Sequence, residues 1–204
     1  MHVVCLDLEG VLVPEIWIAF SQRTGIAEFS RTTRDEPDYD KLMHWRLGLL
    51  KQHGLKLSDI QAVIGGMSPM DGARDFLDDL RTRYQVVILS DTFYQFADPL
   101  MRQLGRPTLF CHQLETDADG FVSHYKLRQP EPKKCAVNAF KSLNLKVIAA
   151  GDSYNDTAML LAADAGFFMH APPAIASQFP QFPENHSYAE LAASIDGAAR
   201  RLSA

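Results

Sequence analysis

The feature that most constrains the fold is an alternation of short apolar runs with longer segments of helical periodicity. Residues 3–6, 86–89 and 147–150 are each typical of a buried strand, and residues 167–169 add a fourth. Helical patterns occupy residues 71–83, 93–104, 132–143, 156–163 and 188–202. This alternation is typical of a parallel sheet covered by helices. We therefore predict an α/β protein with a Rossmann-like parallel sheet core.

Two segments interrupt the alternation and predict additions to this core. Residues 14–67 show only helical patterns, with Gly25 and Gly54 as helix stops and Ser58 as an N-cap. The block is too long for one crossover helix, so we expect a small inserted helical cap, which leaves residues 1–13 and 68–204 as the core. In residues 112–127, two strand-like runs flank a turn, which predicts a β-hairpin.

Composition and charge limit the classes of function. The 204 residues suffice for one compact domain. The formal net charge is −5 and no run of Lys or Arg occurs, so we expect neither nucleic acid nor a membrane as partner. The three cysteines show no CxxC spacing, which indicates reduced thiols. Without a leader-like or bilayer-length apolar segment, the chain is expected to be cytoplasmic, and a homodimer stays open.

Polar side chains stand at the carboxyl ends of the predicted strands, the edge where open parallel sheets bind ligands. Asp7 ends the first strand and could be a nucleophile or a metal ligand. Glu9 would point toward the same pocket and could act as general acid or base. Asp152 and Asp156 follow the third strand and offer the oxygen ligands that Mg²⁺ prefers. A magnesium ion would reduce the repulsion between these carboxylates and a phosphate.

Each of these residues also has an ordinary structural interpretation. Asp7 and Glu9 could lie in a solvated loop. Asn155 and Asp156 could simply cap the following helix. Ser90, at the end of the second strand, could be a turn residue that begins the next helix. It is their ordered combination at three strand ends that indicates phosphoryl transfer.

Helical periodicity separates two neighbouring lysines. Lys133 continues the apolar stripe of the helix predicted at 132–143, whereas Lys134 falls on the solvent face. A lysine on a buried stripe either extends to solvent or neutralises an anion. The nearby carboxylates and a phosphate favour the second alternative.

Two charged residues of the predicted cap suit an amino-acid ligand. Arg46 lies in the middle of an apolar stripe, where it could form an interhelical salt bridge or clamp a substrate carboxylate. Glu15 could favour a helix start through the helix dipole or pair with a substrate ammonium group. A cap that offers both would match the two charges of an amino acid.

These motifs, in this order, resemble those of the haloacid-dehalogenase-like phosphatases, and within them the phosphoserine phosphatases. Residues 7–11 match the first motif, Ser90 the second, Lys133 the third, and the Gly-Asp-x-x-Asn-Asp segment at 151–156 the fourth. The resemblance implies that Asp7 is the nucleophile.

The resemblance also implies the remaining roles. Mg²⁺ would be bound by the Asp7 carboxylate, the Glu9 backbone carbonyl and Asp152, with Asp156 of the same acidic motif counted among the ligands. Ser90 and Lys133 would hold the phosphoryl oxygens. The substrate-binding residues of the site would be Glu15, Arg46, Ser90, Asp91, Lys133 and Asn155.

Two departures from the family pattern point to a subgroup. The family usually has Asp where this chain has Glu9, and Gly where it has Asp91. Both features resemble the phosphoserine–homoserine phosphotransferase subgroup, which hydrolyses phosphoserine and can pass its phosphoryl group to homoserine. Two alternatives stay open: a phosphatase of another small monophosphate, and a signalling receiver domain, which forms an aspartyl phosphate beside Mg²⁺ but has no inserted cap.

Overall fold

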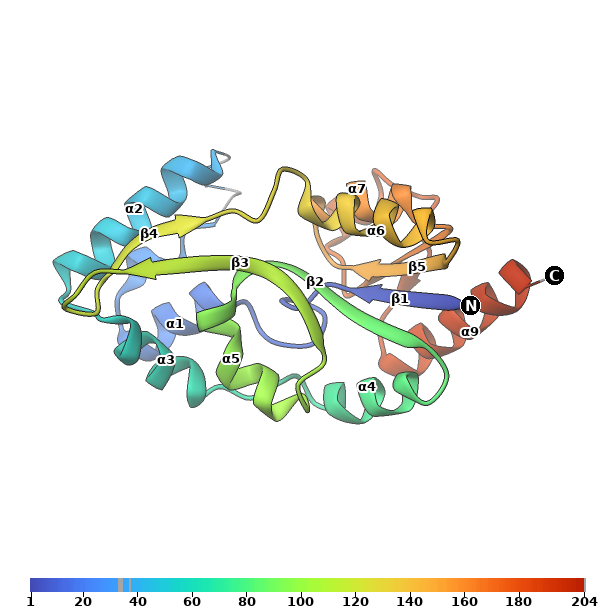
Figure 1. Cartoon of the computed structure of the whole chain (residues 1–204), viewed down its shortest axis with the longest axis horizontal. Helices are drawn as coiled ribbons and strands as arrows, with labels where there is room; N and C mark the ends of the chain where they lie inside the picture. Colours follow the sequence, from blue (N-terminus) through green and yellow to red (C-terminus); the bar gives the residue numbers. More distant parts are fainter. Residues whose placement is uncertain (33–34, 37, 204) are drawn as a thin grey trace.

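The computed structural model describes residues 1–32, 35–36 and 38–203 of the chain. Within these residues, seven strands form one sheet of order β4-β3-β2-β1-β5-β6-β7 (Figure 1). Neighbouring strands are parallel, except that β4 runs antiparallel to β3. The predicted α/β class is confirmed. The strands are β1 His2–Leu6, β2 Gln85–Phe93, β3 Thr108–Thr116, β4 Val122–Lys126, β5 Lys146–Gly151, β6 Ala165–Met169 and β7 Glu184–Asn185.

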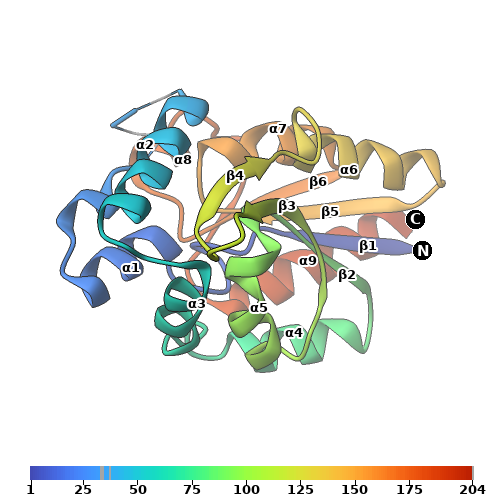
Figure 2. The ribbon, with the colours of Figure 1, turned by 60° about the vertical axis from the view of Figure 1, so that its left-hand side comes forward.

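Helices cover both faces of this sheet (Figures 1 and 2). On one face lie α6 and α7, and on the other α4, α5 and α9. In β1, Val3 and Cys5 join the core under α6 and α7, while Val4 and Leu6 join the opposite core. Burial on both faces explains why this strand is a continuous apolar run. The bounds are α4 Ala73–Arg81, α5 Tyr94–Gln103, α6 Pro132–Ser142, η2 Tyr154–Asp156, α7 Thr157–Ala162, α8 Pro173–Ala176 and α9 Tyr188–Ser203.

A group of helices is inserted between β1 and α4. It consists of α1 (Ile16–Thr24), the 3₁₀ helix η1 (Ala27–Ser30), α2 (Tyr39–Gln52) and α3 (Leu57–Gly65). Figure 1 shows these helices at the end of the sheet toward which β1 points. There α3 packs against α5, and α2 packs against β4 of the hairpin. The inserted helical cap is therefore present; residues 33, 34 and 37 of the predicted range lie outside the described residues.

The expected helix stops are confirmed, but the expected N-cap is wrong. Gly25 ends α1 with a φ of 72°, and Gly54 follows the end of α2 with a φ of 64°. Ser58, in contrast, lies inside α3. The N-cap residue is instead Lys56. Its backbone amide donates a hydrogen bond to Oδ2 of Asp59 at 2.8 Å, because the carboxylate of the third helical residue can reach back to the N-cap.

The second strand is longer than predicted. β2 continues to Phe93, so Ser90 lies inside the strand and not in a turn that begins the next helix. β3 pairs in parallel with β2 over its first half and antiparallel with β4 over its second half, which confirms the predicted hairpin. The sheet therefore extends toward the inserted helices.

In the described ranges, no helix is both long and apolar enough to cross a membrane.

Candidate active site

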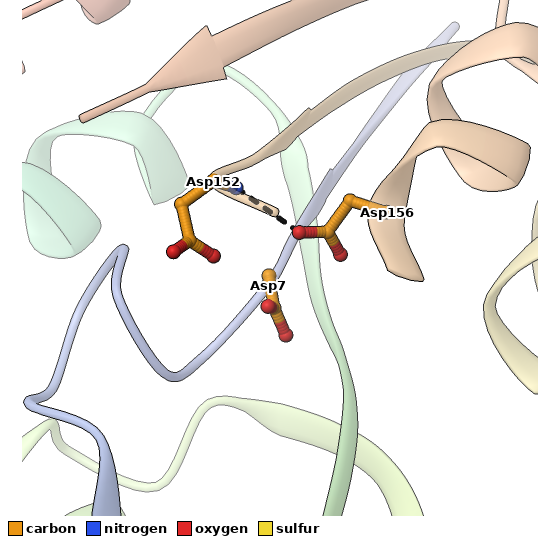
Figure 3. Close-up of side chains that lie close together, drawn as sticks. All are labelled: Asp7, Asp152 and Asp156. Atoms are coloured by element: carbon orange, nitrogen blue, oxygen red, sulfur yellow. Dashed lines mark hydrogen bonds between the residues drawn. The ribbon is translucent and has the colours of Figure 1, made fainter. Parts of the chain in front are cut away.

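Three carboxylates meet at the carboxyl ends of β1 and β5 (Figure 3). Asp7 follows β1, Asp152 follows β5, and Asp156 ends η2. One oxygen from each lies within 4.8 Å of the others. Burial and then Asp156 raise the pKa of Asp7 well above its ordinary value. The same two causes raise the pKa of Asp152 to about 7. The carboxylates therefore repel one another and favour a cation between them.

Lys133 supplies a buried cation to this group from the first turn of α6. Its Nζ lies 2.7 Å from Oδ1 of Asp156 and 2.9 Å from Oδ1 of Asp7. Burial alone would lower the pKa of Lys133, but these two carboxylates raise it well above its ordinary value. Lys134 instead pairs with Glu131, with 40% of its side chain exposed. The prediction that Lys133 is buried beside anions, and Lys134 is not, is confirmed.

The arrangement fits a divalent metal ion. Three close carboxylates are hard oxygen ligands of the kind Mg²⁺ prefers, and a single lysine ammonium does not balance them. The backbone at Gly10 passes close to the Asp152 carboxylate. Gly10 has a φ of 76°, and a Cβ at that position would lie 2.3 Å from Oδ2 of Asp152. A side chain at Gly10 would therefore displace this carboxylate.

Asp156 has a structural role in addition to its place in the group. Its Oδ2 accepts hydrogen bonds from the backbone amides of Asp152 at 3.0 Å and Ser153 at 3.1 Å, and its Oδ1 accepts one from Lys133. The Asp156 side chain therefore caps the start of η2, and not the following helix α7, for which it forms no cap hydrogen bond. Asp7 and Asp152 keep the freer oxygens for a metal ion.

Glu9 lies beside this group and also holds the inserted helices. Its Oε2 accepts a hydrogen bond from the Ile16 amide at 2.8 Å, at the start of α1. Burial and the charge of Glu15 raise the pKa of Glu9 to about 7. A carboxyl group with that pKa can both give and take a proton near neutral pH. Among the described residues, the Glu9 side chain is not part of the carboxylate group that could hold a metal.

Ser90 lies in β2, next to the carboxylates in the sheet. It is 3% exposed, and its Oγ accepts a hydrogen bond from the Thr92 amide at 3.2 Å. No described residue accepts a hydrogen bond from the Ser90 hydroxyl. This donor is therefore available to a phosphoryl oxygen.

Arg46 reaches the site from α2. Its guanidinium carbon lies 4.5 Å from the centroid of the Trp17 ring, and its Nη2 donates to the Arg31 carbonyl at 2.8 Å. The buried Nε has no partner within the described residues. Burial lowers the pKa of Arg46 to about 10, against the opposing effects of Tyr39, Glu9 and Glu15. The expected interhelical salt bridge does not occur among the described residues.

Glu15 occupies the start of α1 and is exposed. No described residue donates a hydrogen bond to its side chain. Its charge nevertheless acts on Glu9, Arg46 and Asp152, so its carboxylate faces the same region as theirs. An exposed carboxylate in this position is open to a cationic ligand.

Sequence reasoning missed two residues that approach Asp91. The Tyr39 hydroxyl donates to the Asp91 carbonyl at 3.3 Å, and His112 in β3 lies beside the Asp91 carboxylate. Tyr39 precedes Arg46 by two helical turns, so their shared helix face was a usable signal. For His112, a lone residue in a predicted strand, there was no signal.

A buried acidic cluster with one lysine, at the carboxyl edge of a Rossmann-like sheet, is suited to the chemistry of a metal-assisted phosphoryl-transfer protein. Residues 1–164 match the family model of haloacid dehalogenase-like hydrolases. The chain belongs to this family. The receiver-domain alternative is thereby disfavoured.

Curated relatives and solved structures agree with this assignment. The phosphoserine phosphatase of Pseudomonas syringae pv. tomato is 61% identical over 191 residues, covering 94% of this chain and 81% of the relative. Phosphoserine phosphatase ThrH of Pseudomonas aeruginosa is also 61% identical, covering 94% and 93%. A structure of a phospho-aspartyl intermediate analogue of a phosphoserine phosphatase superposes with a TM-score of 0.73 at 17% identity, covering 89% of this chain and 91% of that chain. That likeness concerns the fold.

Proposed function

We propose that this chain is a Mg²⁺-dependent phosphoserine phosphatase that carries the phosphoryl group on Asp7 and can also pass it to homoserine. The observation that carries the proposal is the buried contact of 2.9 Å between Asp7 and Lys133 beside a carboxylate group suited to a metal ion. Two relatives of 61% identity bear the name phosphoserine phosphatase. Their names support the same substrate here.

The residues divide the work of phosphoryl transfer. An oxygen of Asp7 attacks phosphorus, the bond from phosphorus to the serine oxygen breaks, and Glu9 gives that oxygen a proton. Ser90 and Lys133 donate hydrogen bonds to the other phosphoryl oxygens as charge develops on them. In the second step a water or alcohol gives its proton to Glu9 and attacks phosphorus, which frees Asp7.

The metal site of this proposal consists of Asp7, Asp152 and the Glu9 backbone carbonyl, with Asp156 beside them. Mg²⁺ held there supplies positive charge next to the phosphoryl oxygens. Asp156 keeps Lys133 and the turn after β5 in place through the hydrogen bonds that its carboxylate accepts.

Residues 14–67 act in this proposal as a cap over a core of residues 1–13 and 68–204. The cap supplies Arg46 for the substrate carboxylate and Glu15 for the ammonium group. The buried Nε of Arg46 has no partner among the described residues, which supports this role, because a buried donor without a partner is costly unless a ligand completes it. We assign Asn155 to the same substrate-binding site.

We also place the protein in the cytoplasm, in keeping with its free cysteines.

Homoserine is serine with one more methylene group, so the same two charged residues can hold it once serine has left. Its hydroxyl then lies near the phosphoryl group on Asp7, where positioning can outweigh the high concentration of water. The side chain of Glu9 is longer than that of Asp and can serve an alcohol as well as water.

A panel of phosphorylated metabolites assayed with Mg²⁺ tests the substrate. Phosphoserine should give the highest kcat/KM, and a preference for a sugar phosphate would contradict the proposal. Labelled phosphate followed from phosphoserine at increasing homoserine tests the transfer. Phosphohomoserine should appear by a ping-pong route, and Glu9→Asp should shift the products toward free phosphate. Inorganic phosphate as sole product at saturating homoserine would mean a plain phosphatase.

A further inference from the structure

Asp91 of β2 lies where residues of four other elements meet: α2, β3, α6 and η2. Its Oδ2 accepts a hydrogen bond from Nδ2 of Asn155 at 2.7 Å and lies 3.5 Å from Nζ of Lys133. Its Oδ1 lies 3.7 Å from Nε2 of His112, and its carbonyl accepts the hydroxyl of Tyr39. Burial alone would raise the pKa of Asp91, but Lys133, His112 and Asn155 bring it below its ordinary value. The carboxylate is therefore ionised and engaged by protein groups.

An irregularity between β2 and β3 brings Asp91 to this junction. Leu89 pairs with Phe110 and Phe93 pairs with His112. Residues 90–92 of β2 thus stand opposite residue 111 alone. Extra residues in one strand form a bulge, which redirects side chains and is common beside active sites. This bulge places Asp91 against the ring of His112.

The hydrogen bond that the His112 ring accepts determines which of its two nitrogens carries the ring hydrogen. The ring is buried, with 3% of the residue exposed. Its Nδ1 lies 3.1 Å from the backbone amide nitrogen of Arg128, which can only donate. Nδ1 must therefore be an acceptor, and the ring hydrogen is on Nε2, the atom that faces Asp91.

Asp91 in turn determines the orientation of the Asn155 amide. The Nδ2 group of Asn155 donates to Asp91, and its Oδ1 accepts the hydroxyl of Ser153. Because an ionised carboxylate can only accept, the amide cannot flip without placing oxygen against oxygen. The second hydrogen of Nδ2 is left for a ligand.

We propose that Asp91 and His112 are positioning residues: His112 orients the Asp91 carboxylate, which holds the Asn155 amide and the Lys133 ammonium in their working positions. The proposal deepens the function proposed above and rests on it for the roles of Asn155 and Lys133. Asp91 thus acts through its neighbours in the protein and does not itself bind the substrate.

Four variants test the chain of contacts. Asp91→Asn keeps the shape but sets amide hydrogens against Lys133 or His112. His112→Leu removes both ring nitrogens, and His112→Gln restores a donor toward Asp91. His124→Gln is the matched control, because His124 is an exposed histidine on the adjacent strand β4.

The kinetic readout is kcat and KM with phosphoserine and with an aryl phosphate such as p-nitrophenyl phosphate. Asp91→Asn and His112→Leu should each lower kcat about 10–100-fold, the usual effect of losing a group that orients an active-site residue. His112→Gln should recover most of the loss, and His124→Gln should match the wild type. A double variant that combines Asp91→Asn with His112→Leu should be no slower than Asp91→Asn alone, because both residues act through one carboxylate.

Other results would overturn the proposal. Losses that multiply in the double variant would mean that the two residues act independently and not through one carboxylate. A lowered Tm with unchanged kcat and KM would mean that they only stabilise the fold. Long-range ¹H–¹⁵N spectra of the wild type give a readout that needs no variant. They should show the His112 hydrogen on Nε2; a hydrogen on Nδ1 would contradict the orientation on which the proposal depends. The aryl-phosphate kinetics and these spectra remain informative even if phosphoserine is not the substrate.

Discussion

The Nζ atom of Lys133 lies 2.9 Å from Oδ1 of Asp7, and both residues are almost completely buried. The pair joins the first turn of α6 to the end of β1. A buried ammonium group here compensates carboxylates that would otherwise repel each other and a phosphate. The same contact therefore serves the stability of the fold and the charge balance of the site.

Lys133→Met should lower the free energy of unfolding by about 3–5 kcal/mol, because it leaves Asp7 and Asp156 without their buried cation. Lys134→Met is the matched control: its exposed partner is Glu131, and we expect a change within about 0.5 kcal/mol. Urea denaturation of both variants measures the difference. Equal losses would mean that the buried pairing does not contribute to stability.

Asp7→Asn should abolish turnover while leaving the fold intact, since the amide is nearly the same size as the carboxyl group but is a poor nucleophile. Beryllium fluoride, an acyl-phosphate mimic, should bind the wild type at Asp7 and not the variant. Circular dichroism checks the fold, and Asp119→Asn in the exposed hairpin turn serves as control. Near-normal activity of Asp7→Asn would rule out the covalent mechanism.

Arg46→Ala should reduce kcat/KM for phosphoserine by an amount corresponding to about 2–5 kcal/mol, the typical cost of removing one partner of a buried charged pair. An aryl phosphate lacks the amino-acid carboxylate, so its hydrolysis should suffer much less. Lys51→Ala, an exposed residue of the same helix, should alter neither. Equal losses on both substrates would assign Arg46 to the fold or to the phosphate.

Gly10→Ala should weaken Mg²⁺ binding, because the new Cβ would collide with the carboxylate of Asp152 at 2.3 Å. Gly25→Ala is the matched control: its φ is 72°, close to the 76° of Gly10, but no described atom outside its neighbouring residues lies within 4 Å of a Cβ there. Both variants should lose about 1–2 kcal/mol of stability from backbone strain. Calorimetric titration with Mg²⁺ should show weaker binding only in Gly10→Ala; equal binding would exclude the steric effect.

Cysteine reactivity tests the burial of the core. Burial raises the pKa of Cys5 and of Cys111 to about 12, so at pH 8 neither forms the reactive thiolate. In the native protein only the partly exposed Cys135 should react with a disulfide reagent, whereas all three cysteines should react after denaturation.

Because folding keeps the thiols of Cys5 and Cys111 protonated, their contribution to stability is complete below the ordinary thiol pKa of 9.0 and is lost as pH rises toward 12. Reaction of three thiols in the native state would contradict the burial.

The sequence by itself determined strands β1, β2, β5 and β6, the inserted helices, the hairpin and the burial of Lys133, but not the two-residue strand β7. These features depend on local periodicity: an apolar run of residues 147–150 must be covered on both faces, and Lys133 shares the buried stripe of its own helix. A helix or strand of this kind is already specified by the spacing of its own side chains. The carboxylates at the strand ends follow from the same pattern, because parallel strands end at one edge of the sheet.

Only the tertiary structure decided how Asp91 is used. Its partners Tyr39, His112 and Asn155 lie 52, 21 and 64 positions away in the sequence, and no local pattern records such pairings. The bulge between β2 and β3 likewise depends on how two strands align, since neither strand alone shows which residue will stand unpaired. Contacts of this kind arise when separate elements pack together, and the chemistry they allow is therefore specified by the fold as a whole.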